Sequence, residues 1–189
     1  MSRIIIISGP SGTGKGTVIE HLMKEESLHL SFSISATNRD PRGSEQHGVE
    51  YYFLSKEEFA RNIDQNLFIE YVEVYPGRYY GTLKSELKRI DTLGRNLLLD
   101  IDVEGALQVK KLYGEQVLSI FLQPPSMAIL RERLEKRGTE TADVIASRLE
   151  RAAYELSFAD KFDRTFVNDN LYQCVEEVKK AILNFLSKK

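Results

Sequence analysis

A glycine-rich segment near the start of the chain carries the residue types that bind phosphate. Gly9-Pro-Ser-Gly-Thr-Gly-Lys15-Gly-Thr17 matches the pattern G-x-x-x-x-G-K, in which glycines let backbone N–H groups turn toward phosphate oxygens and the lysine adds a positive charge. The apolar run 4–7 before it and the helical spacing after it give the strand-to-helix context that the motif requires. The sequence therefore predicts phosphate contacts from Gly9, Pro10, Ser11, Gly12, Thr13, Gly14, Lys15, Gly16 and Thr17.

A second polar cluster follows downstream. Arg39 and Arg42 lie three positions apart, Glu45 comes three positions later, and Tyr51 follows six beyond it. Arginine presents a rigid fork of N–H donors that matches a phosphate, and a phenolic hydroxyl can donate to the same anion. Solvated charges on a loop are the alternative interpretation, but the phosphate-binding loop upstream favours a second anion site.

The chain closely resembles the guanylate kinases, whose signature reads Thr-Ser/Thr-Arg-x-x-Arg-x-x-Glu-x-x-Gly-x-x-Tyr-x-Phe after a phosphate-binding loop. Here the stretch is Thr37-Asn-Arg39-Asp-Pro-Arg42-Gly-Ser-Glu45-Gln-His-Gly48-Val-Glu-Tyr51-Tyr-Phe53. Further matches lie at 68–70, 79–82, 99–105, 124–126, 137–141, 148–149 and 167–169. The Gly-Lys-Gly-Thr ending of the loop also resembles adenylate kinases, which favours a nucleoside monophosphate kinase. The departures at Gly16, Asn38 and Gly43-Ser44 remove no charged group.

This resemblance implies an acceptor site for GMP. The residues that it assigns to the GMP phosphate are Arg39, Arg42, Tyr51 and Tyr80, with Glu45 in the same site, and those that it assigns to the base are Ser35, Glu70, Thr82 and Asp102. The chemistry of guanine agrees, because its N1–H and 2-amino groups are donors that the carboxylates of Glu70 and Asp102 can accept from. Adenine offers neither donor, and an unpaired buried polar group costs roughly 1 to 3 kcal/mol.

The expected reaction transfers the γ-phosphoryl group of ATP to GMP, and also to dGMP. Its main obstacle is repulsion between two polyanions, so we expect positioning and charge neutralisation without a general base. The expected catalytic residues are Lys15, Arg42, Arg137 and Arg148, of which Arg148 could instead be an exposed structural arginine. Thr17 and Asp100, the latter through water, are the candidates for Mg²⁺. By resemblance, Asn168 and Asp169 lie beside the adenine or ribose of ATP, although an Asn-Asp pair also suits a turn.

Alternating strand-like and helical stretches must position these residues. Strand-like runs at 4–7, 96–101 and 117–122 alternate with helical spacing at 16–26, 104–113 and 126–137, and a strand at 164–167 and a helix at 171–186 close the chain. This alternation is typical of a mostly parallel sheet flanked by helices. We therefore expect an α/β fold of the P-loop nucleoside-kinase type in one domain, 1–189. Its predicted parts are a core at about 1–32, 83–125 and 150–189, a small GMP-binding insert at about 33–82, and a helical lid at about 126–149.

Composition narrows the function classes. The chain has 189 residues, with 26 basic and 28 acidic side chains, so a formal net charge of −2 disfavours a nucleic-acid-binding protein. Its one cysteine, Cys174, can form no intrachain disulfide, and no apolar run is long enough to span a membrane, so we expect a cytoplasmic enzyme without a membrane partner. The alternatives are a guanylate-kinase-like binding module, which the intact Lys15 disfavours, and a kinase for another nucleotide such as AMP or IMP. The sequence does not indicate the oligomeric state.

Overall fold

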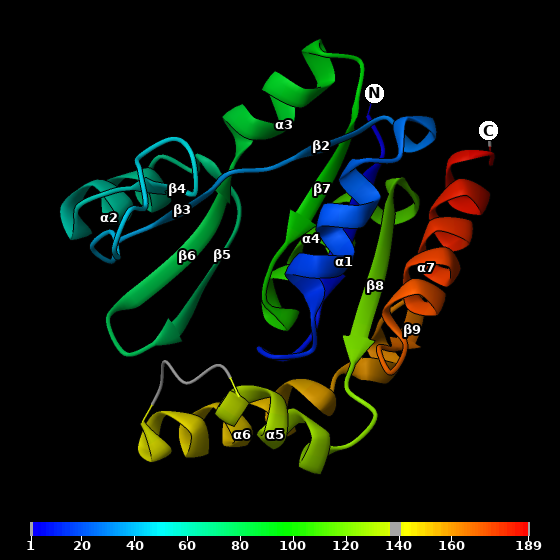
Figure 1. The fold of residues 1–189 in the computed structure, drawn as a ribbon. Helices are drawn as coiled ribbons and strands as arrows, with labels where there is room; N and C mark the ends of the chain where they lie inside the picture. Colours follow the sequence, from blue (N-terminus) through cyan, green and yellow to red (C-terminus); the bar gives the residue numbers. More distant parts are fainter. Residues whose placement is uncertain (1, 137–140, 189) are drawn as a thin grey trace.

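A five-stranded parallel sheet forms the centre of the molecule (Figure 1). The computed structural model describes residues 2–136 and 141–188. The strands lie in the order β2 (Leu30–Phe32), β7 (Asn96–Asp100), β1 (Ile4–Ser8), β8 (Val117–Gln123) and β9 (Arg164–Val167). The predicted mostly parallel sheet is thus confirmed.

Helices cover both faces of this sheet because β1 is apolar on both of its faces. Ile5 and Ile7 pack in a cluster with side chains of α1 (Lys15–Met23) and α7 (Leu171–Leu186). Ile4 and Ile6, which alternate with them, pack instead with side chains of α3 (Lys84–Thr92) and α4 (Val103–Tyr113). The period of two along a strand therefore divides one run of isoleucines between two cores. Short 3₁₀ turns at Glu26–Leu28, Gly114–Gln116 and Ala159–Lys161 connect the larger elements.

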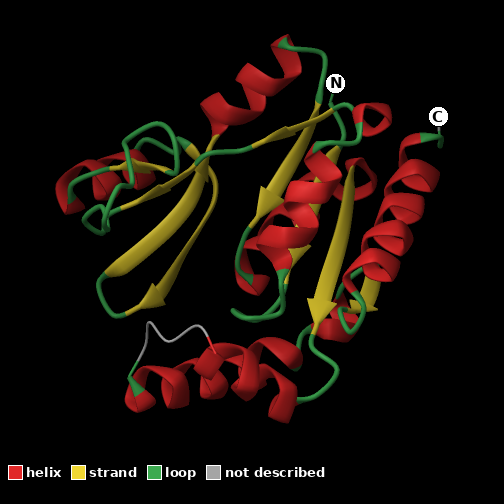
Figure 2. Cartoon of the chain, in the orientation of Figure 1, coloured by secondary structure: helices red, strands yellow, loops and turns green. Residues whose placement is uncertain are grey.

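A second, smaller sheet makes up the insert at 33–82 (Figure 2). Its strands lie in the order β4 (Tyr51–Phe53), β3 (Ser35–Thr37), β6 (Arg78–Leu83) and β5 (Phe68–Tyr75), and its small core contains Ala36, Phe59 and Phe68. The insert also holds a helix that periodicity did not predict, α2 (Lys56–Asp64). A capping box begins it, in which Ser55 accepts from the backbone of Glu58 and the Glu58 side chain accepts from the backbone of Ser55.

The chain passes from the core into the insert after β2 and returns to the core between β6 and α3. Glu86 of α3 contacts residues of both the insert and the core. Its carboxylate accepts hydrogen bonds from the backbone of Ile34 at 2.9 Å, from the hydroxyl of Tyr52 at 3.0 Å and from Arg89 at 2.8 Å. Burial opposes ionisation of Glu86, but the hydrogen bonds from Arg89, Ile34 and Tyr52 lower its pKa below the ordinary value. Because its carboxylate is buried and accepts from several donors, Glu86 holds the insert firmly to α3.

Two helices lie across the edge of the sheet where the parallel strands end (Figure 1). α5 (Met127–Lys136) and α6 (Ala142–Leu156) share an apolar cluster of their own, formed by Leu130, Leu134, Ile145, Leu149 and Ala152. Helix α6 continues through residue 149, where the lid was predicted to end. Arg137, one of the predicted catalytic residues, lies outside the described residues. No helix in the described part of the chain is long and apolar enough to cross a membrane.

Candidate active site

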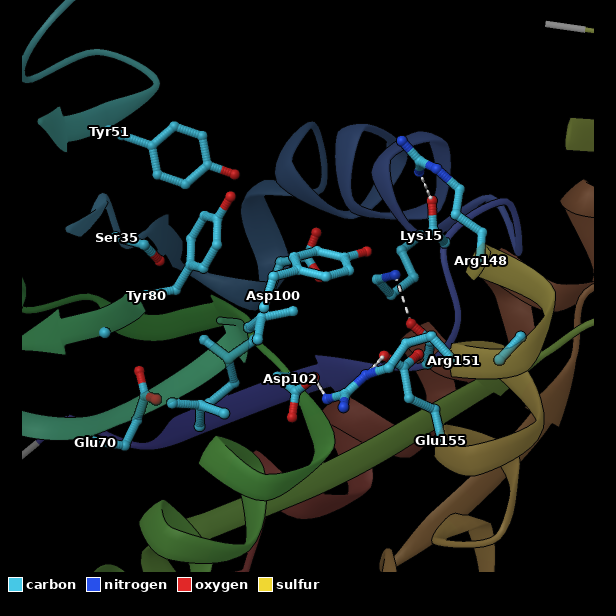
Figure 3. A pocket seen from close by; sticks show the side chains of 18 residues that line it. Lys15, Ser35, Tyr51, Glu70, Tyr80, Asp100, Asp102, Arg148, Arg151 and Glu155 are labelled. Carbon is cyan, nitrogen blue, oxygen red and sulfur yellow. Dashed lines mark hydrogen bonds and ion pairs between the residues drawn. The ribbon is translucent and has the colours of Figure 1, made fainter. Parts of the chain in front are cut away.

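One cavity of about 280 Å³ lies between the carboxyl edge of the main sheet, the insert and α6 (Figure 3). The predicted residues that line it are Gly9, Ser11, Lys15, Ser35, Tyr51, Glu70, Tyr80, Asp100, Asp102 and Arg148. Lys15 and Arg148 lie on one side, and Ser35, Tyr51, Tyr80 and Glu70 lie on the other (Figure 3). Segments far apart in the sequence thus bring the phosphate-binding loop to the same cavity as Tyr51 and Tyr80, whereas Arg39 and Arg42 do not line it.

The phosphate-binding loop between β1 and α1 needs glycine at two positions. Gly9 has a φ of +135°, and a Cβ there would lie 2.0 Å from the carbonyl oxygen of Leu122. Gly14, with a φ of +88°, precedes α1, and a Cβ there would lie 2.5 Å from the side-chain nitrogen of Asn168. Both positions combine a left-handed backbone with close packing, so the loop conformation depends on these glycines.

Two cations contact this loop. The Lys15 ammonium donates to the carbonyl oxygen of Gly9 at 2.6 Å, and Arg148 of α6 donates to the hydroxyl of Ser11 at 2.5 Å. Both side chains line the cavity, whereas their contact with phosphate stays a prediction. A bound polyphosphate would therefore meet positive charge from the core and from α6 together.

Asn168, in the loop after β9, hydrogen-bonds to the backbone of the phosphate-binding loop. Its buried side-chain amide donates to the backbone carbonyl of Thr13 at 2.7 Å, and its backbone carbonyl accepts from the Arg133 guanidinium at 2.9 Å. Its side chain therefore contacts the loop backbone, whereas contact of Asn168 with adenine or ribose stays a prediction. Asp169 beside it is exposed.

In the insert, Arg39 lies at the centre of a network that includes the predicted phosphate ligands. Its guanidinium makes a two-pronged ion pair with Glu45 at 2.6 and 2.8 Å, donates to the hydroxyl of Tyr80 at 3.2 Å, and lies 4.9 Å from the ring centre of Tyr51. The hydrogen bond from Arg39 lowers the pKa of Glu45 to about 2. Glu45 does not line the cavity, so the role that its contacts support is to orient Arg39.

Arg42 is exposed and lines a neighbouring cavity of about 520 Å³. That cavity also includes Tyr80 of the insert and Arg148 of α6. The two cavities therefore share Tyr75, Tyr80 and Arg148, and Arg42 lies on the insert side of the space between the insert and α6. Its backbone N–H donates to Glu45 at 2.8 Å, which links it to the Arg39 network.

A β-bulge aims Glu70 into the cavity. Phe68 pairs with Leu83 and Glu70 pairs with Thr82, so β5 contains one extra residue, Ile69, whose side chain packs in the main core. Glu70 is only 4% exposed, and the Thr82 hydroxyl donates to its carboxylate at 2.7 Å. Burial raises the pKa of Glu70 to about 7, against the opposing effect of that hydrogen bond. Thr82, which was also predicted here, therefore holds Glu70 in place.

Asp102 belongs to a second carboxylate group at the same end of the cavity. It caps α4 by accepting from the backbone of Glu104 at 2.9 Å, and it accepts from Arg151 of α6 at 2.6 Å. Arg151 also donates to Glu155 at 3.1 Å, and burial raises the pKa of Glu155. Neither Arg151 nor Glu155 was among the site residues predicted from the sequence. No local pattern predicts this pairing, because Arg151 and Asp102 lie 49 residues apart.

Thr17 and Asp100, the predicted residues for Mg²⁺, offer a hydroxyl and a carboxylate oxygen. Thr17 is exposed in the first turn of α1, and Asp100 lines the cavity, where burial raises its pKa and the charge of Lys15 opposes this rise. Within residues 2–136 and 141–188 there is no cluster of three or more His, Cys, Asp or Glu side chains that could hold a metal alone. Mg²⁺ retains water and binds through one or two protein oxygens plus phosphates, so these residues fit an ion that arrives with a nucleotide.

Comparison with known proteins agrees with this arrangement. The family model described as Guanylate kinase matches residues 1–184. The chain belongs to the guanylate kinase family. The guanylate kinase of Porphyromonas gingivalis is 55% identical over 188 residues, covering 100% of both chains, and that of Bacteroides fragilis is 51% identical over 98% of this chain and 90% of the relative.

A solved guanylate kinase supports the fold as well. The crystal structure of guanylate kinase from Anaplasma phagocytophilum superposes with a TM-score of 0.80 at 30% identity, covering 100% of this chain and 88% of that one. The predicted P-loop kinase fold and the predicted guanylate kinase activity class are therefore confirmed.

Proposed function

We propose that this guanylate kinase transfers the γ-phosphoryl group of ATP to GMP, giving ADP and GDP, and that it accepts dGMP, which has the same base and phosphate. The observation that carries the proposal is that one cavity has the Lys15 loop at one end and the buried Glu70 carboxylate at the other. Nucleotides of this kind are cytoplasmic metabolites, which agrees with the expected cytoplasmic location.

The acceptor specificity follows from the carboxylates. Glu70 and Asp102 present oxygens to the same cavity, and guanine supplies two adjacent donors, N1–H and the 2-amino group. Adenine would leave a buried acceptor without a donor, at a cost of about 1–3 kcal/mol for each group. Hydroxyls at the cavity wall, such as that of Ser35, could donate to the guanine O6.

The chemistry requires two anions to be held in contact. Lys15 and Arg148 would bind the donor phosphates, and Arg39, Arg42 and the tyrosine hydroxyls would bind the GMP phosphate. To do so, Lys15 exchanges the carbonyl of Gly9 for a phosphate oxygen. No general base is needed, since the accepting phosphate is already ionised. Closure of α5 and α6 over the cavity would exclude water, which otherwise competes as an acceptor.

Mg²⁺ would accompany ATP in this scheme. Thr17 would offer it a hydroxyl and Asp100 would bind one of its waters, as the fit described above allows. When bound, the ion supplies neutralisation of the donor phosphates.

A coupled assay of ADP production with GMP, dGMP, AMP and IMP tests the proposal. We expect turnover with GMP and dGMP, weaker turnover with IMP, which lacks the 2-amino group, and little with AMP. Lys15→Ala should lower kcat by orders of magnitude while the circular dichroism spectrum is unchanged. Binding of GMP without any turnover in the presence of ATP and Mg²⁺ would refute the proposal and favour the binding module.

A further inference from the structure

Gly105 lies in the first turn of α4, where the helical backbone conformation does not require a glycine. Glycine destabilises a helix relative to alanine, and Gly105 has none of the positive φ values that favour it at Gly9 and Gly14. It is also buried, so exposure to solvent does not explain it. The cause must lie in what approaches this turn.

The Glu70 carboxylate occupies the space that a side chain would need. A Cβ on Gly105 would lie 2.5 Å from Oε2 of Glu70, closer than a non-bonded carbon can remain, and 3.1 Å from its Cδ, which is also a tight contact. Glu70 has little freedom to move aside, because it is 4% exposed and its other oxygen, Oε1, accepts from Thr82 at 2.7 Å. Thr82 thus holds one oxygen of the carboxylate, and the lack of a Cβ on Gly105 leaves room for the other.

We propose that Gly105 is a positioning residue for guanine recognition: it lets the Glu70 carboxylate lie against α4, where it can accept from the N1–H and 2-amino groups of GMP. The inference rests on the proposed function, since it requires Glu70 to contact the base. Both carboxylates then lie at the turn that begins α4: Asp102 is its N-cap, and Glu70 of β5 packs against Gly105, its third residue. The positive end of the helix favours both anions there.

The test compares Gly105→Ala, Glu70→Asp and the double variant. Gly105→Ala should raise the KM for GMP by at least about tenfold and leave the KM for ATP unchanged, because displacing Glu70 removes acceptor contacts alone. Glu70→Asp withdraws the carboxylate by one methylene, which makes room for the new methyl group. The double variant should therefore have a KM for GMP no higher than that of Gly105→Ala, a non-additive outcome that two independent losses cannot give.

Two further variants separate the possible failures. Ala106→Gly is the reverse exchange at the next residue of the same helix, in the main core, and should leave the KM for GMP within about twofold while lowering stability. Glu70→Gln tests the proposed function itself. If Glu70→Gln leaves the KM for GMP unchanged, the base-reading role of Glu70 is wrong. If Glu70→Gln raises it but Gly105→Ala does not, only the role of Gly105 is wrong.

Folding is monitored by thermal melting in each case. If Gly105→Ala does not fold but the double variant does, the steric conflict with Glu70 is supported directly. If neither folds, the inference is overturned, because the need for glycine would then not depend on the length of residue 70.

Discussion

The pKa of Glu70 predicts how GMP binding depends on pH. Burial raises this pKa to about 7 in the ligand-free cavity, and only the ionised carboxylate can accept from both N1–H and the 2-amino group. At pH 8 about nine-tenths of the molecules would be ionised, and at pH 6 about one-tenth. Because apparent affinity falls with the competent fraction, the KM for GMP should rise by about tenfold between pH 8 and pH 6.

The assay is steady-state ADP production at saturating ATP, with GMP varied at each pH. The phosphate of GMP titrates in the same range, so Glu70→Gln serves as the control: it keeps that contribution and removes the carboxylate. The KM of the variant should be higher at pH 8 and change much less between the two pH values. Equal pH dependence in wild type and variant would refute the assignment of this titration to Glu70.

Four other outcomes are expected. Glu70→Gln should raise the free energy of unfolding at pH 8 more than at pH 5 in urea titrations. In the wild type, ionisation of the buried Glu70 carboxyl destabilises the folded protein as pH rises through about 7, and the variant has no carboxyl to ionise. Asn168→Ala should cost about 1–3 kcal/mol in the same measurement and raise the KM for ATP, since the Thr13 carbonyl loses its donor. Gly9→Ala should destabilise the protein by about 3 kcal/mol or more, through the contact with Leu122 and the left-handed backbone, and an unchanged midpoint would contradict this. Glu45→Gln should raise the KM for GMP but not for ATP, because Arg39 loses its orienting partner.

The sequence predicted the parts of the site that local backbone chemistry determines. The loop from Gly9 to Thr17 could be identified because the spacing of its glycines determines its backbone conformation. The ends of β9 and α7 were predicted as observed because their apolar residues recur regularly. The polar helix α2 was missed since few of its residues are apolar, although the capping box at Ser55 and Glu58 was a usable signal.

The parts of the site that the sequence did not predict depend on contacts between residues far apart in the sequence. Arg151 pairs with Asp102 only because α6 packs beside the start of α4, and Asn168 contacts Thr13 across 155 residues of sequence. The need for glycine at 105 likewise follows from the bulge that turns Glu70 toward α4. Spacing in one sequence carries no information about such approaches.

The insert is held to the core at two separate contacts, the hydrogen bonds to Glu86 and the packing of β5 on α4. At the second contact, Ile69 of β5 lies in the same apolar cluster as side chains of α4. The two carboxylates of the proposed base site lie at this contact, Glu70 on the insert and Asp102 on the core. A guanine that donates to both carboxylates would therefore bridge the insert and the core, whereas a base that satisfies one of them would be bound from one side only.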